Sequence, residues 1–397
     1  MISPMISLSQ ALDDPAFVQN PYAFYEQARA LGPFFRWTDY DLPFTTRAAA
    51  VNAIFRDRRF GREAPPEHAP PIAPHTAPFY EVEADSMLEL EPPRHTRLRS
   101  LVLRAFTSRR IAALAPEIAA LSHQLIDAFP QGEFDLLTRF GQKLPVIIIA
   151  RLLGVPEQMS DDLLKWSNAM VGMYRANRDR ETEYRAVRAT KAFTAFLHDC
   201  VDQRRAKPAD DLITHLIAAS DHGDRLTTDE LISTCILLLN AGHEATVHTI
   251  GNGVKTLLET ATPHSALTAT TIEPTVEEIL RFDPALHIFT RWAYEDVEVM
   301  GHTFHRGDRV GLLLGAANRD PQVWDDPARF NPTRPVKPNA TFGAGLHFCV
   351  GAPLARLELQ IALPILFERL PNLRLARSPH YADVYHFHGL QSLMVQA

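Results

Sequence analysis

The chain has 397 residues, of which 46% are hydrophobic and 22% are charged, and its formal net charge is -7. A negative chain is not attracted as a whole to nucleic acid or to an anionic membrane, so neither is an expected partner. Its cysteines, Cys200, Cys235 and Cys349, are too few for a disulfide framework or a structural zinc site, which fits a reducing cytoplasm.

The N-terminal residues have no basic segment followed by an apolar core, so we expect no signal peptide. No apolar run reaches about 18 residues, so we expect no membrane anchor. "NPYAFYEQARALGPFFRW" predicts a short helix that stops at Gly32-Pro33 before a strand, and "RAAAVNAIFRD" predicts a second helix. Residues 61–80 hold six prolines, which break helices and sheets, and they predict a long loop.

From about residue 92 to residue 260 the apolar residues recur with helical spacing. The predicted helices are "LRSLVLRAFT", "IAALAPEIAALSHQLIDAF", "LPVIIIARLLGV", "DDLLKWSNAMVGMYRAN" and "AVRATKAFTAFLHDCVDQRRA". The longest predicted helix begins at a capping box formed by Thr227 and Glu230 and runs to about Leu258. At 1.5 Å per residue it is roughly 45 Å long, so it must cross the molecule.

The last third mixes short elements. "TVEEILRFDP" predicts a helix that Asp283-Pro284 stops. Strand-like stretches follow in "ALHIFTRWAY", "VEVMGHTFHR" and "DRVGLLLGAAN", and residues 320–340 are proline-rich and irregular. A final helix and short strands close the chain, so the pattern is mainly α with small sheets.

The segment "FGAGLHFCVG", residues 342–351, places Cys349 between glycines and just before a helix that Pro353 can start. The partial positive charge at a helix N-terminus favours a thiolate, which is the form that ligates iron. The segment alone fits two interpretations, a buried structural cysteine or a metal ligand. Zinc is disfavoured because no second cysteine pair exists.

The same segment matches without a gap the heme-binding signature F-G-x-G-x-H-x-C-x-G, so the chain resembles the cytochrome P-450 family. The resemblance implies that Cys349 is the thiolate ligand of heme iron and that Phe342 packs beside the heme. It also implies that His347 contacts a heme propionate and that Gly343 and Gly351 shape the loop.

In "TVEEILRF", Glu278 and Arg281 lie three residues apart and share a helix face. Alone, they fit an exposed ion pair of small energetic value. The resemblance implies instead a buried, structural E-x-x-R pair that locks to an arginine, for which Arg329 in "DDPARFNP" is the candidate.

In "EPPRHTRLR", His95 and Arg99 lie four residues apart and point the same way. Alone, the pair fits a solvated helix face. The resemblance implies that both bind heme propionates, together with Arg291 in "FTRWA", because guanidinium groups pair well with carboxylates.

In the long helix, Ala241, Gly242, Ala245 and Thr246 of "NAGHEATVH" fall within about 140° of arc. Small residues here fit close helix packing or, by the resemblance, room for heme and dioxygen. The family motif A-G-x-[DE]-T places a proton-delivering acid at Glu244, but its threonine is replaced by Ala245. We hypothesise that Thr246, ordered water or a substrate hydroxyl supplies the missing hydroxyl.

The resemblance covers nearly the whole chain and implies one cytochrome P-450 domain over residues 1–397, an α-helical prism around a buried heme b. It implies a cytoplasmic monooxygenase that uses dioxygen and two external electrons to oxidise a small, largely apolar organic molecule. The electron donors would be a ferredoxin and its reductase, and we expect a monomer.

The resemblance also implies a substrate cavity and a surface patch on which the electron donor docks. The predicted cavity residues are Phe79, Met170, Met173, Ile288, Phe289 and Leu390. Because ferredoxins are usually acidic, the predicted docking residues are the arginines Arg99, Arg104, Arg109, Arg110 and Arg356.

Two alternatives stay open. Ala245 leaves room for a peroxide-driven or other atypical heme-thiolate enzyme. A non-enzymatic heme-binding partner protein is the more remote alternative, since the chain keeps both Cys349 and Glu244.

Overall fold

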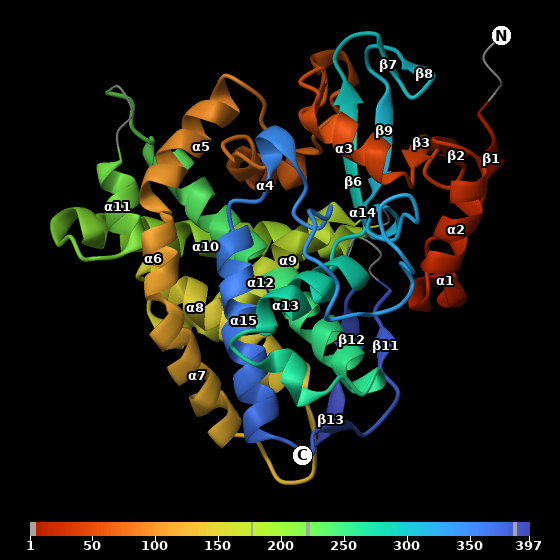
Figure 1. The fold of residues 1–397 in the computed structure, drawn as a ribbon. Coiled ribbons are helices and arrows are strands. Elements are labelled where there is room, and N and C mark those ends of the chain that lie inside the picture. The colour runs from red at the N-terminus through yellow and green to blue at the C-terminus, as the bar shows by residue number, and fades with distance from the viewer. Residues whose placement is uncertain (1–4, 176–177, 220–222, 384–386) are drawn as a thin grey trace.

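The computed structural model describes residues 5–175, 178–219, 223–383 and 387–397. Helices make up most of the body, as Figure 1 shows. They are α1 (Pro15–Gln19), α2 (Tyr22–Ala30), α3 (Ala48–Arg56), α4 (Ala77–Glu83), α5 (Arg94–Ala105), α6 (Ser108–Ala113), α7 (Ala115–Asp127), α8 (Lys143–Leu153), α9 (Ser160–Val171), α10 (Arg180–Ala206), α11 (Leu212–Ala218), α12 (Thr228–Glu259), α13 (Ile272–Phe282), α14 (Leu314–Ala317) and α15 (Ala352–Arg369). Among the described residues, no helix combines the length and the apolar character needed to cross a membrane.

The strands form one six-stranded sheet and three smaller ones. The large sheet has the order β1 (Ser7–Leu8), β2 (Phe35–Trp37), β3 (Leu42–Thr45), β9 (Arg309–Leu313), β6 (Ile288–Ala293) and β4 (Phe60–Gly61). The smaller sheets are β10 (Arg374–Leu375), β13 (Met394–Gln396) and β5 (Glu133–Asp135), then β11 (His380–Tyr381) with β12 (Leu390–Ser392), and β7 (Val297–Val299) with β8 (His302–Phe304). The large sheet pairs strands from both ends of the chain, since β3 lies parallel to β9 with Phe44 opposite Gly311.

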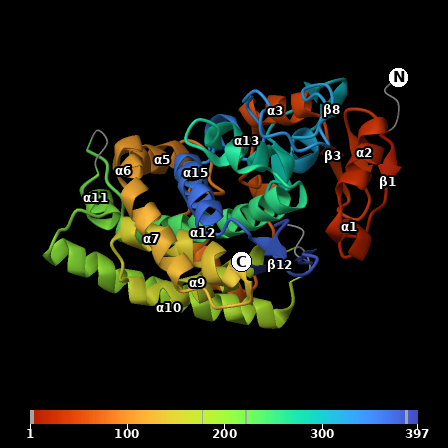
Figure 2. The ribbon, with the colours of Figure 1, turned by 60° about the horizontal axis from the view of Figure 1, so that its bottom comes forward.

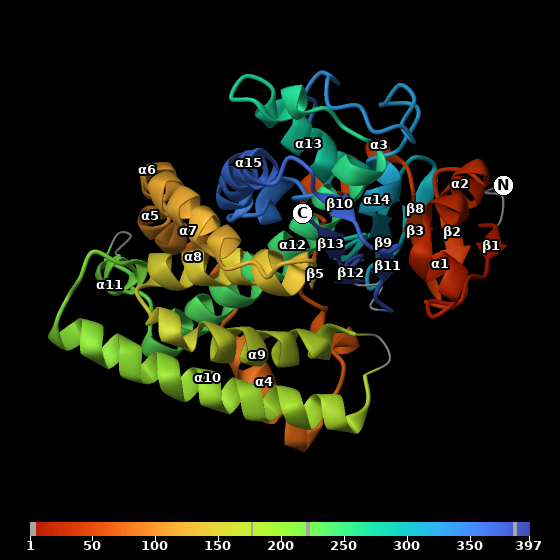
Figure 3. The ribbon, with the colours of Figure 1, turned by 90° about the horizontal axis from the view of Figure 1, so that it is seen from below.

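Helix α12 forms the centre of the helical body. Its start is fixed by the predicted capping box, in which the Glu230 amide donates to the Thr227 hydroxyl and the Thr227 amide donates to the Glu230 carboxylate. Every residue from Leu231 to Asn240 is buried, because α8, α9, α10, α13 and α15 all pack against this helix. Figures 2 and 3 show α10 along one side of the body, with α1 and α2 on the other.

Most predicted elements are confirmed, and several need correction. The strand predicted in "DRVGLLLGAAN" ends at Leu313 and α14 follows it. The helix predicted through residue 177 ends at Val171, and residues 176–177 lie outside the described residues. The proline-rich segment 61–80 is not a plain loop. A proline begins each of the 3-10 turns Pro66–His68 and Pro74–Thr76, and another proline lies in the first turn of α4. The segment predicted as one helix from Ile111 is two helices, α6 and α7, with the junction at Leu114, and Pro116 is the second residue of α7.

Candidate functional site

The cysteine loop runs from Phe342 to the start of α15. Gly343 and Gly345 have φ of 67° and 68°, a conformation that favours glycine. A Cβ at Gly345 would lie 2.2 Å from the Phe55 carbonyl oxygen, so the loop presses closely on α3. The Cys349 amide donates to the Phe342 carbonyl at 3.0 Å, which closes the loop just before α15.

The surroundings of Cys349 act on its sulfur in opposite directions. Burial raises the pKa of the thiol, while the backbone N–H groups of Gly351 and Ala352 and the guanidinium groups of Arg99 and Arg356 oppose that rise. The residue still keeps exposed surface. Burial is the largest influence, so the pKa of the free thiol lies above its ordinary value, while the four opposing groups are those that would stabilise a metal-bound thiolate.

The two helix residues predicted to bind propionates lie beside the loop. Arg99 donates from Nη2 to the Phe348 carbonyl at 2.6 Å, next to the cysteine. The ring centroids of His95 and His347 are 4.3 Å apart, so segments far apart in sequence meet here. His347 also lies 2.8 Å from a Glu91 carboxylate oxygen through its Nε2.

Arg291 is the most buried cation of this group, at 3% exposure. Its guanidinium lies 4.9 Å from the Phe55 ring centroid, and burial, together with the charge of Arg62, lowers its pKa to about 9. It forms no ion pair with a carboxylate of the described residues. Burial and neighbouring cations also lower the pKa of His95 to about 4, and its Nδ1 is buried without a partner there.

These observations test whether the residues fit a heme. Burying the Arg291 guanidinium without a carboxylate partner costs free energy, and so does burying His95 Nδ1 without a hydrogen bond. A bound anionic group that accepts hydrogen bonds would remove both costs. The two propionates of a heme are such groups, and Cys349 offers a sulfur donor at the same place. The donor set therefore fits heme b.

Two neighbours of this cation group were not predicted. Arg62 pairs with Glu89, lies 5.5 Å from the Phe289 ring centroid, and has a buried Nε without a partner among the described residues. Glu91 accepts from the Arg62 amide at 2.7 Å as well as contacting His347. Arg62 lies inside the proline-rich segment and Glu91 in the connection before α5, and no periodic pattern marks either side chain as inward.

The E-x-x-R pair is buried as the resemblance implies. Arg281 donates from Nε and Nη2 to the two Glu278 oxygens at 2.7 and 2.8 Å, and both side chains are nearly inaccessible. The prediction that Arg329 supplies the third side chain is wrong. Arg329 is exposed and contributes its carbonyl, whereas the Arg334 guanidinium reaches Glu278 at 3.2 Å. The chain turns back between the two arginines and brings Arg334 inward.

The middle of α12 differs from its buried surroundings. Ala241 is exposed, and Gly242, Glu244 and Ala245 keep partial exposure. The Thr246 hydroxyl donates to the Gly242 carbonyl at 3.2 Å, so its proton is used within the helix. A Cβ at Gly242 would meet Ile149 at 3.4 Å, an ordinary contact, so packing against α8 does not itself demand glycine.

The predicted substrate-cavity residues fall in separate places. Phe79, Met170, Met173 and Leu390 all belong to the large helical core, and each is at most 4% exposed. The two strand residues lie on different faces of β6. Ile288 packs in the N-terminal aromatic cluster with Phe17 and Trp37, so its assignment to the cavity is not supported, while Phe289 packs near Phe55.

The predicted docking arginines are not all available. Arg356 forms an ion pair with Glu277, with Nη2 at 3.2 Å from the carboxylate. Arg110 donates to the backbone of its own segment and is half-buried. Arg104 and Arg109 are exposed at the end of α5 and the start of α6.

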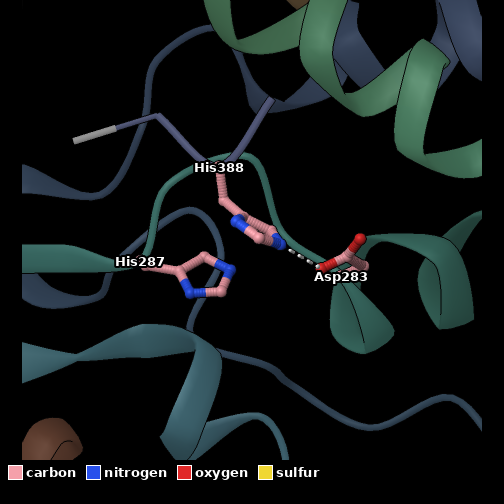
Figure 4. A group of neighbouring side chains, drawn as sticks. All are labelled: Asp283, His287 and His388. Carbon is pink, nitrogen blue, oxygen red and sulfur yellow. Dashed lines mark ion pairs between the residues drawn. The ribbon is translucent and has the colours of Figure 1, made fainter. Parts of the chain in front are cut away.

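A second polar cluster, Asp283, His287 and His388, places potential ligand atoms within 4.8 Å of one another (Figure 4). His388 Nε2 lies 3.4 Å from Asp283 Oδ1, and burial lowers the pKa of His388 to about 3. The Tyr22 hydroxyl donates to Asp283 Oδ1 at 2.8 Å, and the Tyr381 hydroxyl donates to Oδ2. Because both carboxylate oxygens already accept hydrogen bonds, we interpret the cluster as a structural tie between α2, α13 and the C-terminal segment.

Comparisons with known proteins show which family the whole chain resembles. The family model described as cytochrome P-450 matches residues 270–372. Cytochrome P-450 107B1 of Saccharopolyspora erythraea is 39% identical over 82% of this chain and 77% of its own length. The biotin biosynthesis cytochrome P-450 of Bacillus subtilis is 34% identical over 98% of this chain and 99% of its own.

A solved structure of a cytochrome P-450 named BioI, in complex with an acyl carrier protein ligated to hexadec-9Z-enoic acid, superposes with a TM-score of 0.89. It is 33% identical and covers 96% of this chain and 99% of that one. Coverage of this extent, at identities above 30%, means that the chain belongs to the cytochrome P-450 family.

Proposed function

We propose that this chain is a heme-thiolate monooxygenase that oxidises a small, largely apolar organic molecule with dioxygen and two electrons supplied from outside. Family members bind heme b through a thiolate, and the relatives are named as monooxygenases and hydroxylases. The observation that carries the proposal is Cys349, whose sulfur faces the backbone N–H groups of Gly351 and Ala352 at the head of α15.

In this proposal, Cys349 is the proximal ligand, and Phe342 and Gly343 shape the loop that presents it. His95, Arg99, Arg291 and His347 bind the two propionates. The bound heme supplies oxygen activation and electron transfer. The chain itself positions the heme, neutralises its carboxylates and excludes water around them.

Glu244 is the proposed proton donor on the opposite side, on the helix face that carries Ala241 and Ala245. Its carboxylate, whose pKa is held, despite its burial, below its ordinary range by His243, His248 and Arg175, would take up a proton and pass it on. Because Ala245 offers no hydroxyl, the proton must reach the reacting oxygen through water or through a group on the substrate.

We propose a cytoplasmic monomer that receives electrons from a ferredoxin and its reductase. The exposed Arg104 and Arg109 support a docking surface for an acidic protein. Rates of electron transfer that fall as salt rises from low to high concentration are expected. Salt-independent rates would remove the electrostatic part of this proposal.

The proposed substrate is apolar because Phe79, Met170, Met173, Phe289 and Leu390 are hydrophobic and come from family cavity positions. The BioI structure holds an acyl chain of this character. The direct test titrates a panel of apolar compounds into the purified holoprotein and follows the heme absorption. A shift shows that a compound displaces the iron-bound water, and a protein without heme absorption would contradict the proposal.

Ala245 favours a second candidate function, an atypical heme-thiolate enzyme driven by peroxide. Because Ala245 lacks the usual threonine hydroxyl, proton delivery to dioxygen is impaired. Peroxide already carries the protons and electrons that dioxygen would need, so it does not depend on that delivery. Turnover with peroxide alone that is faster than turnover with ferredoxin and reductase would favour this candidate over the monooxygenase.

A further inference from the structure

Glu244 lies between two histidines of its own helix. His243 Nε2 is 3.8 Å from Glu244 Oε1, and His248 Nε2 is 3.5 Å from Oε2. Burial by itself would raise the pKa of Glu244, but the hydrogen bond from His248 and the charges of His243, His248 and Arg175 hold it below its ordinary range. The carboxylate is therefore bracketed by two imidazoles of its own helix.

The two histidines differ in what else they contact. His243 is 1% exposed, with Nδ1 2.9 Å from the Leu239 carbonyl and Nε2 3.4 Å from the Asn168 amide oxygen. Burial lowers its pKa, so it is a neutral packing residue. The His248 side chain is 19% exposed, and its Nδ1 has no partner among the described residues.

The position of the His248 ring is fixed by the C-terminal segment. A Cβ at Gly389 would lie 1.9 Å from His248 Nδ1, so only glycine leaves room for the ring there. The Phe387 ring lies 5.5 Å away, measured between centroids. The imidazole is therefore held in place from outside its own helix, with Nε2 toward Glu244.

His248 also lies on the helix face that matters for the proposed reaction. At about 100° per residue, His248 lies within about 60° of both Ala241 and Ala245, and Glu244 lies about 40° beyond it. Ala245 has no exchangeable proton, and the Thr246 hydroxyl donates to its own helix. Near Ala245, Glu244 and His248 offer side chains on this face that can exchange a proton.

We infer that His248 is a proton-relay residue that passes a proton to Glu244. In family members with a threonine at the position of Ala245, its hydroxyl would take part in this proton delivery. In each transfer the Nε2–H bond of the imidazolium breaks and an O–H bond forms at Glu244 Oε2. The ring becomes neutral, the carboxylate becomes a carboxyl, and no electrons move. Water returns the proton to the ring before the next transfer.

Other charged groups facing this pair are Arg175 and His243 beside Glu244, and His388 from the C-terminal segment beside His248. His388 is neutral in the folded protein, and the basic side chains nearby are Arg175 beside Glu244 and Lys255 and Arg319 beside His388. The inference rests on the proposed function, because a proton relay has a use only where oxygen is reduced.

The first test needs no substrate and follows the ring nitrogen resonances of the isotope-labelled holoprotein by NMR. Replacing Glu244 by Gln removes the negative charge 3.5 Å from His248 Nε2, so the resonance of that nitrogen shifts. His215, whose Nε2 lies 2.8 Å from the exposed Asp210, is the matched control, and its resonances stay where they are. An unchanged His248 resonance would overturn the contact on which the relay depends.

The second test feeds the substrate-free holoprotein electrons from a plant-type ferredoxin and its reductase and measures peroxide against water formed from dioxygen. Peroxide takes two protons and two electrons, and two waters take four of each. We expect His248→Asn to raise the peroxide-to-water ratio about a hundredfold, the low end of acid–base effects. His215→Asn leaves the ratio unchanged, and adding Ala245→Thr to His248→Asn lowers it again.

A ratio that does not change in His248→Asn overturns the relay and leaves the proposed function intact. Conversely, a protein that lacks heme absorption contradicts the proposed function, while the NMR measurement still reports whether His248 and Glu244 interact. The two failures are therefore distinguishable.

Discussion

At the scale of single residues, side chains are held by partners that their own segment does not reveal. Glu278 is an example, since it accepts from Arg281 three residues away and from Arg334 over fifty residues away. The sequence predicts the first contact from helix spacing. It did not distinguish Arg334 from Arg329, because the choice depends on how an irregular, proline-rich segment turns.

Arg334→Ala should destabilise the fold more than Arg329→Ala. The first variant removes charge-assisted hydrogen bonds to a buried carboxylate and should lower the free energy of unfolding by about 1.5–3 kcal/mol. Arg329 is exposed, and its carbonyl remains after substitution, so its variant should change stability by less than about 0.5 kcal/mol. Denaturant unfolding of both variants checks this, and equal losses would contradict the assignment of Arg334.

Glu358 on α15 supplies a pH-dependent prediction. Burial raises the pKa of its carboxyl to about 8, and neither oxygen has a partner among the described residues. Between the unfolded pKa, about 4.5, and 8, the folded state keeps a proton that the unfolded state releases, so rising pH favours unfolding through this group. The slope is at most about 1.4 kcal/mol per pH unit.

Glu358→Gln should therefore gain stability relative to the natural protein as pH rises from 5 to 8. The comparison isolates this group, because His95 and His388, with pKa values lowered to about 4 and 3, act in the opposite direction in both proteins. The measurement is the free energy of unfolding of the two proteins at several pH values. A constant difference between them would show that Glu358 is not a buried neutral acid.

At the scale of elements, helices with periodic apolar faces and clear caps are predictable, and irregular segments are not. The long helix α12 ends within a residue or two of its predicted bounds because its capping box and burial pattern are local. The α6–α7 junction at Leu114 was missed because the apolar spacing continues across the break. Arg62 and Glu91 were missed because their inward direction depends on contacts with distant segments.

The cysteine loop makes an element-scale prediction that compares two glycines. Both Gly343→Ala and Gly345→Ala place a side chain at positive φ, which costs about 1–2 kcal/mol. Only at Gly345 does the new Cβ also collide with backbone, at the Phe55 carbonyl, so about 1–3 kcal/mol more is expected there. Thermal unfolding and heme retention measure the difference, and equal losses would contradict the close packing of the loop on α3.

At the scale of the whole molecule, the chain's ends meet around one helical body. β3 from the N-terminal part pairs with β9, and the Asp283 cluster joins α2 to the C-terminal segment. These contacts tie together the parts of the chain that carry the cysteine loop, the residues His95, Arg291 and His347, and the centre of α12. Sequence motifs predicted the family and the positions of these groups, whereas the long-range ties between them became visible only in three dimensions.

The central claim is that a heme is bound through Cys349, and the absorption of the reduced protein with carbon monoxide tests it most directly. The natural protein should show the red-shifted band of a thiolate-ligated heme. The Cys200→Ala and Cys235→Ala variants should keep this band, since burial raises the pKa of both thiols and keeps them protonated. Cys349→Ala should lose the band even where heme remains bound, and its persistence in that variant would contradict the account.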